Sequence, residues 1–271
     1  MGDIINNTKS IEYLIIIGIG TMFLLIISFL LSFNLSQRRK FQYRQQMQEM
    51  KEKQQNQLIE AAVRSEEMER HRISEELHDE VGALLSATKL FLGHIKPESL
   101  TEADQQLHSK SISLLDESIE KVRSISHNLH SVILKDLGLN EAIKNFIQKI
   151  IKGSSLKITV ETDDAYITAN PENDISIYRI IQELCNNIIK HAHATEIFIN
   201  SSVKDDYLNI IIRHNGKGLS QEEFEKLRYH SDGLGLKNIQ NRIILLHGKI
   251  KFESDHDGDT TTLQIPIKLK T

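Results

Sequence analysis

An uncharged apolar run near the N-terminus most constrains how this chain folds. The run, YLIIIGIGTMFLLIISFLLSFNLS, extends from Tyr13 to Ser36 and contains no charged residue. At about 1.5 Å per residue, a helix of this length crosses a bilayer core of about 30 Å. The sequence therefore predicts a transmembrane helix over residues 13–36.

The charges beside this run predict its orientation. Four basic residues lie between positions 38 and 44, whereas residues 1–12 hold one lysine and two acids. Basic residues favour the cytoplasmic side, so we predict a single-pass protein of the cytoplasmic membrane with its N-terminus outside. A cleaved signal peptide is the alternative, but the run is long, follows no basic segment and lacks a small-x-small cleavage site. The tail, residues 1–12, is too short to fold alone.

The rest of the chain has the composition of a globular protein of about two folded units. The formal net charge is −4, which gives no reason to expect direct binding of nucleic acid. The single cysteine, Cys185, excludes an intrachain disulfide and a cysteine-based metal site. Tryptophan is absent and aromatic residues make up only 6%, which argues against a platform that stacks bases or sugars.

Helical patterns dominate the segment after the membrane. Residues 37–68 are rich in Gln, Glu, Lys and Met and contain no Gly or Pro, which predicts a coiled-coil linker with a polar seam. Two apolar stripes follow, joined by the turn PESLTEAD, with Pro97 ending the first helix. The first stripe is Ile73, Leu77, Val81, Leu84, Thr88, Phe91 and Ile95, and the second is Leu107, Ser111, Leu114, Ser118, Val122, Ile125, Leu129 and Val132.

Two amphipathic helices joined by a short turn form an antiparallel hairpin, which we assign to residues 69–135. A single hairpin hides only part of each stripe. We therefore expect two hairpins to pair into a four-helix bundle, which would make the protein a homodimer.

Residues 136–271 predict an α+β domain. Asn140 is the expected cap of a helix that extends to about Ile151, and further helices are expected at about 171–192 and 236–246. KDD, between the second and third predicted strands, suits a hairpin turn. Helices mixed with mostly antiparallel strands predict a sandwich with the helices on one face of the sheet. The predicted strands are LKITVET, TEIFINSSV, YLNIIIR, KIKFES and TTTLQIPIKL.

One histidine on the first hairpin helix is a candidate for chemistry. His78 follows Leu77, about 100° round the helix from the middle of the stripe, so we expect it at the solvent-open margin of the bundle. Asp79 is adjacent, and an acid beside an imidazole can hold one ring nitrogen protonated while the other acts as a nucleophile. Adjacent helix positions do not face each other, however. A structural histidine is the alternative interpretation, since the chain holds 12 histidines.

A second candidate site begins in QELCNNIIKHAHA. Glu183, Asn187 and Lys190 fall at i, i+4 and i+7 of one helix, where they could hold Mg²⁺ and phosphate oxygens. A polar helix face in water gives the same pattern. Downstream, HNGKGL and SDGLGLKNI each contain a G-x-G, and such glycines let the backbone and a helix N-terminus approach phosphates. Each signal is weak alone.

Residues 69–82 read E-R-x-R-I-x-x-E-L-H-D-x-V-G, which resembles the phosphoacceptor box of bacterial two-component sensor histidine kinases. The box resembles that of the subfamily typified by nitrate/nitrite sensors, and LKDLGLNEAI resembles the exit from the family's dimerisation hairpin. The resemblance implies that His78 accepts a phosphoryl group and that Asp79 is the general base. Family members with phosphatase activity often place Gln four residues after that acid. Ala83 stands there in this chain, which weakens the case for that activity.

The later motifs resemble, in order and spacing, the N, G1 and G2 boxes of the ATP-binding fold shared by histidine kinases, gyrase and Hsp90. The resemblance implies that Asn187 ligates Mg²⁺, that Lys190 and His191 meet phosphates, and that residues 216–235 form a lid. The implied site for ATP and Mg²⁺ consists of Glu183, Asn187, Lys190, His191, His214, Asn215, Gly216, Gly218, Gly233, Leu234, Gly235, Leu236 and Thr260.

Two positions depart from that pattern. The aspartate with which the family receives the adenine amino group is replaced by His214, and the glycine of its late Gly-Thr pair is replaced by Asp259. A neutral imidazole accepts one hydrogen bond but lacks the charge and bidentate reach of a carboxylate. Asp259 and Asp232 are the candidate substitute acceptors.

These observations predict a membrane-anchored homodimeric kinase that autophosphorylates His78 with ATP. By resemblance, the phosphoryl group then passes to an aspartate in the receiver domain of a response regulator, usually one with a LuxR-type DNA-binding domain. One alternative is a degenerate kinase that acts as a nucleotide-poor scaffold or heterodimer partner, and a more distant one is a membrane-tethered coiled-coil adaptor. We expect the stimulus to enter through the span, the linker or a partner membrane protein.

Overall fold

The structure is a computed structural model, and it divides the chain into two compact units, Met1–Gln57 and Leu58–Thr271, which are described separately. Side chains are described from residue 17 onwards. The residues described are 2–96, 101–129, 132–152, 154, 156–167, 170–227, 234–255 and 258–267.

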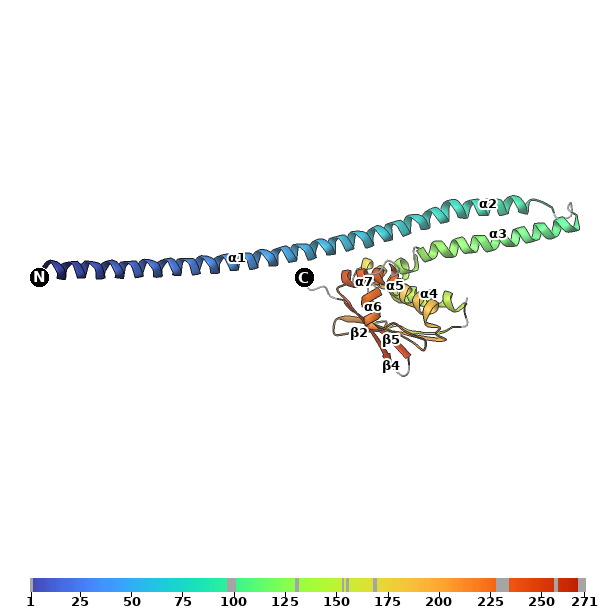
Figure 1. Cartoon of the computed structure of the whole chain (residues 1–271). Coiled ribbons are helices and arrows are strands. Elements are labelled where there is room, and N and C mark those ends of the chain that lie inside the picture. The colour runs from blue at the N-terminus through green and yellow to red at the C-terminus, as the bar shows by residue number, and fades with distance from the viewer. Residues whose placement is uncertain are drawn as a thin grey trace. The chain divides into compact units, whose positions relative to one another are not determined.

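The first unit consists of helix, as predicted for the apolar run and most of the linker. It forms the greater part of α1 (Gly2–Glu76), which Figure 1 labels. One helix among the described residues is long and apolar enough to cross a membrane, and it lies near the N-terminus. The apolar side chains between Ile17 and Leu35 are exposed. An uncovered apolar surface of this length indicates membrane anchoring. The orientation remains a prediction.

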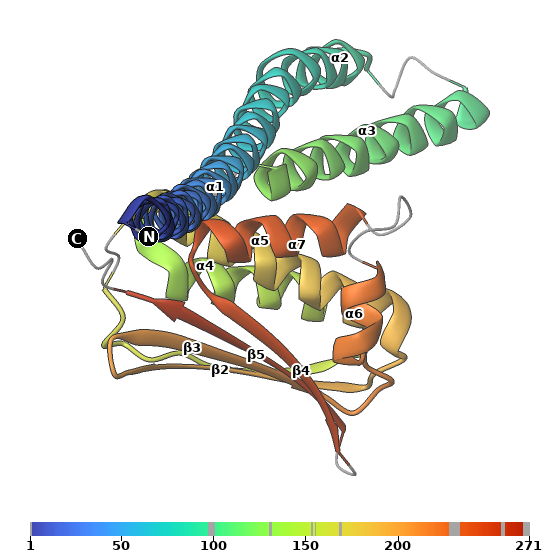
Figure 2. The ribbon, with the colours of Figure 1, turned by 60° about the vertical axis from the view of Figure 1, so that its left-hand side comes forward.

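In the second unit, the end of α1 continues into the predicted antiparallel hairpin (Figures 1 and 2). The hairpin contains the π-helical turn η1 (Leu77–Val81), α2 (Gly82–Gly93) and α3 (Glu102–Leu129). Buried Ser74 and Ser126 join α1 to α3, because their hydroxyl oxygens lie 2.9 Å apart and each also donates to the other's carbonyl oxygen at 3.0–3.1 Å. Pro97 lies outside the described residues, and α2 ends before it, at Gly93.

The apolar stripes predicted for the hairpin remain largely exposed in the single chain. Leu84 and Phe91 on α2 are 69% and 74% exposed, and Leu114 on α3 is also exposed. The contact between the helices of one hairpin uses another face of α3, on which Ile119 is buried. A long uncovered apolar face is typical of an interaction surface, which supports the predicted pairing of two hairpins.

The helix expected to start at Asn140 has a different boundary. α4 (Val132–Lys152) is already helical at Val132 and is interrupted at Gly138, whose φ of +80° is a conformation that favours glycine. Asn140 lies inside α4, and its side-chain amide donates to the carbonyl oxygen of Asp163 at 3.0 Å. The predicted cap was therefore wrong.

Five strands form one sheet in the order β1-β2-β3-β5-β4, in which only β1 and β2 are parallel. The turn between β2 and β3 consists of Asp205 and Asp206, both with positive φ, which fits the tight hairpin predicted from KDD. The strands are β1 (Lys157–Glu161), β2 (Glu196–Lys204), β3 (Tyr207–His214), β4 (Lys249–Asp255) and β5 (Gly258–Pro266).

Helices α4, α5 (Pro171–Asn187) and α7 (Leu234–Leu245) cover one face of this sheet, as predicted (Figure 2). Asn170 caps the start of α5, because its side chain accepts a hydrogen bond from the N–H of Glu172. Alternate residues of β3 and the apolar side of α5 share one core that includes Ile180 and Ile210, both fully buried. Burying one such side chain contributes about 2–3 kcal/mol, so the two elements that carry most of the candidate site are held rigidly.

Candidate functional site

His78 lies in the π-helical turn η1 of the hairpin. Such turns are rare and are frequently found at functional sites. His78 and Asp79 are exposed while Leu77 is half-buried, so the histidine lies at the margin of the helix pair, as predicted. Among the described residues, no hydrogen bond joins the imidazole to the Asp79 carboxylate, in keeping with adjacent helix positions that point apart.

The other charged residues of this motif pair with one another. Arg72 binds the carboxylates of Glu69, at 2.9 Å from Nε, and of Glu76. The hydrogen bond from Arg72 lowers the pKa of Glu69. Glu75 lies 3.2 Å from Nδ1 of His71. These exposed pairs stabilise the helix little. Asp79 and Glu80, both in η1 with His78, form no ion pair with an arginine or another histidine in the described structure, and Asp79 is the adjacent one.

A pocket of about 530 Å³ lies between α5 and the sheet. Its rim includes the short helix α6 (Gln221–Leu227), which the sequence did not predict, and the first turn of α7. Residues of the three motifs singled out in the sequence, QELCNNIIKHAHA, HNGKGL and SDGLGLKNI, line this pocket together. The predicted site residues that line it are Glu183, Asn187, His191, His214, Gly218, Gly235, Leu236 and Thr260.

Other predicted residues do not line the pocket in the described structure. Lys190 and Leu234 are exposed to solvent, and Gly233 lies outside the described residues. Lys190 and His191 belong to a second π-helical turn, η3 (Ile188–Ala192). A π-helical turn holds more residues than an α-helical turn. This wider turn accounts for His191, rather than Lys190, lying with Asn187 at the pocket.

Asn215 and Gly216 support the loop after β3. The side-chain oxygen of Asn215 accepts from the N–H groups of Thr195 and Glu196 at 2.9 and 3.1 Å, which ties the end of β3 to the start of β2. A Cβ added at Gly216 would overlap the carbonyl of Ala192, so glycine is needed for the loop to pack against η3.

The two glycines that line the pocket each approach an acidic side chain closely. A Cβ added at Gly218 would overlap Asp259, and one at Gly235 would overlap Glu183. Gly235 lies in the first turn of α7, where backbone N–H groups lack partners within the helix and can bind an anion. The backbone of Gly218 therefore lies against the Asp259 carboxylate, and that of Gly235 against the Glu183 carboxylate, at the pocket.

His214 forms the buried wall of the pocket. It ends β3, pairs in register with Asp259 of β5 and is only 5% exposed. Burial lowers the pKa of His214, although Asp259 and a backbone hydrogen bond to Gly216 oppose the shift. The imidazole is therefore neutral at neutral pH. The Asp259 carboxylate accepts hydrogen bonds from the Gly218 N–H and the Ser254 hydroxyl.

Sequence reasoning missed much of the pocket's apolar wall. Leu184, Ile188 and Phe252 line it, and the ring of Phe252 packs 4.8 Å from that of Phe224 on α6. Thr261 is buried on the same face of the sheet as His214, and it continues the alternation of Leu263 and Ile265. The alternation of Thr261, Leu263 and Ile265 was the sequence signal that could have placed Thr261 on the buried face. The α6 segment gave none, because it is short and polar.

Both candidate regions match known families. Residues 69–134 match a family model described as histidine kinase, and residues 172–270 match one described as histidine kinase-, DNA gyrase B- and HSP90-like ATPase. Over 195 residues the chain is 31% identical to the sensor protein VraS of Staphylococcus aureus, covering 72% of this chain and 54% of that protein. The match to VraS of Staphylococcus epidermidis is 30% identical with the same coverage. This chain belongs to the sensor histidine kinases.

The chain spans about half the length of the curated relatives it matches. Among solved structures, the histidine kinase AdeS of Acinetobacter baumannii is 17% identical, with a TM-score of 0.42 over 72% of this chain and 98% of that one. The membership rests on the two matched families, and the second of them implies ATP as a ligand.

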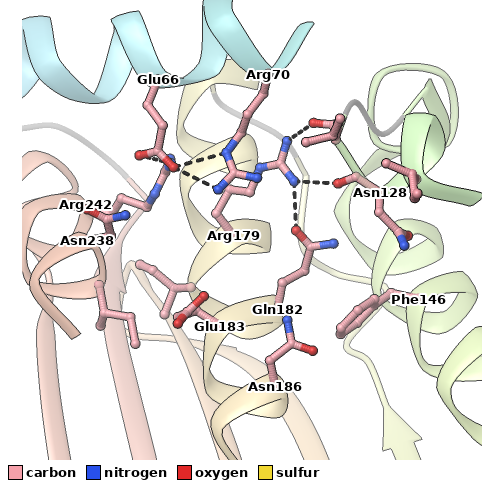
Figure 3. A pocket seen from close by; sticks show the side chains of 14 residues that line it. Glu66, Arg70, Asn128, Phe146, Arg179, Gln182, Glu183, Asn186, Asn238 and Arg242 are labelled. Carbon is pink, nitrogen blue, oxygen red and sulfur yellow. Dashed lines mark hydrogen bonds and ion pairs between the residues drawn. The ribbon is translucent and has the colours of Figure 1, made fainter. Parts of the chain in front are cut away.

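This sensor histidine kinase has a second hollow, of about 310 Å³, on another side of α5 (Figure 3). Arg179 of α5 and Arg242 of α7 are 8% and 3% exposed, and both bind Glu67 near the end of α1. Arg242 also binds Glu66 at 3.2 Å. We call these four residues the stalk clamp.

Arg179 of the stalk clamp also donates hydrogen bonds to backbone carbonyls at the end of α3. Nη1 of Arg179 donates to the Asn128 carbonyl and to Gln182, both at 2.9 Å, and Nη2 donates to the Leu129 carbonyl. Nη1 of Arg242 has no partner in the described structure. Sequence reasoning missed the clamp, and its available signal was an arginine among apolar residues in YRII and again in NRII.

Proposed function

We propose that this kinase transfers the γ-phosphoryl group of ATP to its own His78 and then to an aspartate in the receiver domain of a response regulator. The observation that carries the proposal is the exposed imidazole at the π-helical turn of the segment that matches the histidine kinase family. Nothing in the described structure covers this ring, so a phosphate donor or a receiver domain has open access to it.

The chemistry at His78 needs a free ring nitrogen and a proton acceptor. A neutral imidazole nitrogen attacks the γ-phosphorus in line, a P–N bond forms, and the bond to the ADP oxygen breaks. The ring then loses the proton of its other nitrogen, and Asp79 accepts it after a change of rotamer. The protein contributes mainly by positioning the groups and neutralising charge.

The pocket in the ATPase domain holds groups suited to each part of ATP. The apolar wall offers a surface for a base, while Lys217 and the start of α7 offer positive groups for phosphates and His191 offers a ring N–H. Glu183 and Asn187 supply hard oxygen ligands of the kind Mg²⁺ prefers, and few are needed because Mg²⁺ usually keeps waters and binds substrate phosphates. When bound there, Mg²⁺ would neutralise the phosphate oxygens.

The remaining features follow from the sequence and the family. We propose a membrane anchor at 13–36 with a short outer tail at 1–12, a coiled-coil linker at 37–68, a dimerising hairpin at 69–135 and a catalytic domain at 136–271. The exposed apolar stripes of α2 and α3 support a homodimer. The family pairs with response regulators, and we propose a LuxR-type output.

The first test is labelling of the full chain, in detergent, with γ-labelled ATP and Mg²⁺. We expect acid-labile, base-stable label that is absent in His78→Gln. The control is His71→Gln, which removes an exposed histidine two turns before His78 on the hairpin and should keep full label. Label that survives in His78→Gln would contradict the assignment. An unlabelled wild-type dimer would favour the degenerate scaffold, the alternative suggested by His214 and Asp259.

A further inference from the structure

The ATPase domain is built around a hydrophobic core to which the hairpin helices contribute nothing in the described structure. The buried residues of this core lie between Leu134 and Ile265, and none of those described belongs to α1, η1, α2 or α3. A domain with a core of its own can move as a rigid body relative to a neighbouring element. The chain passes from the hairpin into the domain once, after Leu129, so other contacts decide where the domain lies.

The stalk clamp is the charged contact that holds this domain against α1. Arg242 binds both Glu66 and Glu67. Arg179 binds Glu67 and two carbonyls at the end of α3. A hollow of about 310 Å³ lies beside these groups, so the stalk and the domain are not packed continuously there (Figure 3). Water can rehydrate charged groups when they part, which offsets part of their lost attraction. A contact of this kind is able to open.

With the stalk clamp closed, the nucleotide pocket and His78 do not meet. The residues that line the pocket in the described structure lie between Glu183 and Thr261, whereas α1 and α3 border only the stalk hollow. His78 lies about three helical turns, or about 16 Å, beyond Glu67. The γ-phosphorus must come within bonding distance of the ring nitrogen. Transfer to the ring of the same chain therefore requires the domain to leave the stalk clamp.

We propose that the stalk clamp is an autoinhibitory latch, which holds the ATPase domain at the linker end of the hairpin and opens to let the bound nucleotide reach His78. This inference rests on the proposed transfer of a phosphoryl group to His78. In the described structure, none of the four residues of the stalk clamp lines the nucleotide pocket. Opening the latch therefore changes the rate of transfer and not the affinity for ATP. A stimulus that parts the stalk from the two arginines starts autophosphorylation.

The test is Glu67→Gln, which removes the carboxylate that both arginines share and keeps the length of the side chain. Initial rates of His78 labelling are measured on the full chain in detergent, with Mg²⁺ and a range of concentrations of γ-labelled ATP. A domain that is mostly latched transfers only during its open fraction, so a larger open fraction raises the maximal rate. We expect about a ten-fold higher maximal rate, with the ATP concentration that gives half of it unchanged.

The matched control is Glu60→Gln, which removes a carboxylate from an exposed position of the same helix and should keep the wild-type rate. Arg242→Gln opens the latch from the side of the domain and should also raise the rate. The double variant of Glu67 and Arg242 should be about as fast as the faster single variant, because both changes open one contact. Should Arg242→Gln fail to fold, Glu67→Gln and its control decide, since Glu67 lies outside the domain core.

The inference and the proposed function fail in different ways. A maximal rate in Glu67→Gln that is equal to or below that of the wild type would overturn the latch and keep the proposed function. A rise that Glu60→Gln reproduces would do the same, because it would trace the effect to the net charge of the stalk. Absence of label at His78 in the wild type and in every variant would contradict the proposed function itself.

Discussion

Two hollows flank α5, Glu183 lines both, and they differ in the charges that their walls carry. The stalk clamp pairs Arg179 and Arg242 with Glu67, so the chain itself supplies both charges of the interaction. The nucleotide pocket combines an apolar wall with exposed Lys217, and no ion pair of Lys217 is found in the described structure. The comparison indicates that the first hollow holds the domain to its own stalk and that the second is open to a ligand.

The largest expected effect comes from breaking the stalk clamp. Arg179→Gln removes one of the two arginines bound to half-buried Glu67 and the donors to the Asn128 and Leu129 carbonyls, and the loss of one partner from a buried pair costs about 3–5 kcal/mol. Because solvent reaches part of Glu67 and Arg242 still binds it, we expect a loss of about 2–3 kcal/mol, measured as the decrease in unfolding free energy of the full chain in denaturant.

The control for this change is Lys157→Gln. It removes the exposed pair between Lys157 and Glu196, which are 73% and 59% exposed, and exposed pairs contribute about 0–1 kcal/mol. Equal losses in the two variants would show that the stalk clamp is no stronger than a surface pair. Hydrogen exchange over residues 58–76 should rise only in Arg179→Gln.

A smaller effect is expected at the pocket rim. Gly235→Ala places a Cβ against Glu183, so this carboxylate must move and the first turn of α7 shifts from the phosphates. We expect about a ten-fold loss of ATP affinity with little change in stability, as one hydrogen bond is worth about 1 kcal/mol or slightly more. Gly93→Ala is the control, because nothing lies within 4 Å of a Cβ there. Undiminished affinity in Gly235→Ala would place the phosphates elsewhere.

The smallest effect is a dependence on pH. Burial lowers the pKa of His214 below its ordinary 6.5, so its contribution to stability is complete above that value and is lost as pH falls through the folded pKa. Asp259 faces the ring and moderates the shift, while Glu183, His191, Lys217, Glu223 and Glu253 are the other charged or titratable side chains around the pocket.

Thermal unfolding between pH 8 and pH 5 measures this dependence. We expect the wild type to lose more stability than His214→Leu on acidification, by less than the loss caused by Arg179→Gln. Parallel curves for the two proteins would contradict the assigned neutral state of His214.

Much of the fold could be predicted because it depends on local periodicity. The alternation in β3 and the positive φ of Asp205 and Asp206 follow from residue types close together in the chain. The break at Gly138 falls in the gap predicted between the hairpin and the next helix, but the helix after it begins before Asn140 and not at that residue. α6 was missed because its seven residues show Phe224 as their one buried apolar side chain.

The candidate site was predictable in outline only. Motif spacing identified the loops around Gly218 and Gly235, but it assumed a regular helix through Lys190, and the π-helical turn changes which side chain reaches the pocket. The stalk clamp joins positions more than a hundred residues apart. No local pattern specifies such a pairing, since arginine on an amphipathic helix is usually solvated.

The hydroxyl pair of Ser74 and Ser126 has a mechanical consequence. Its hydrogen bonds cross between two helices in buried surroundings, so displacing α1 along its own axis would break all of them at once. Rotating α1 about that axis would swing the Ser74 hydroxyl sideways and break the same bonds, because the hydroxyl lies off the axis. His78 is one turn further on, about 6 Å along the helix. The pair thus fixes both the height and the rotation of α1 against α3 directly before the reactive ring.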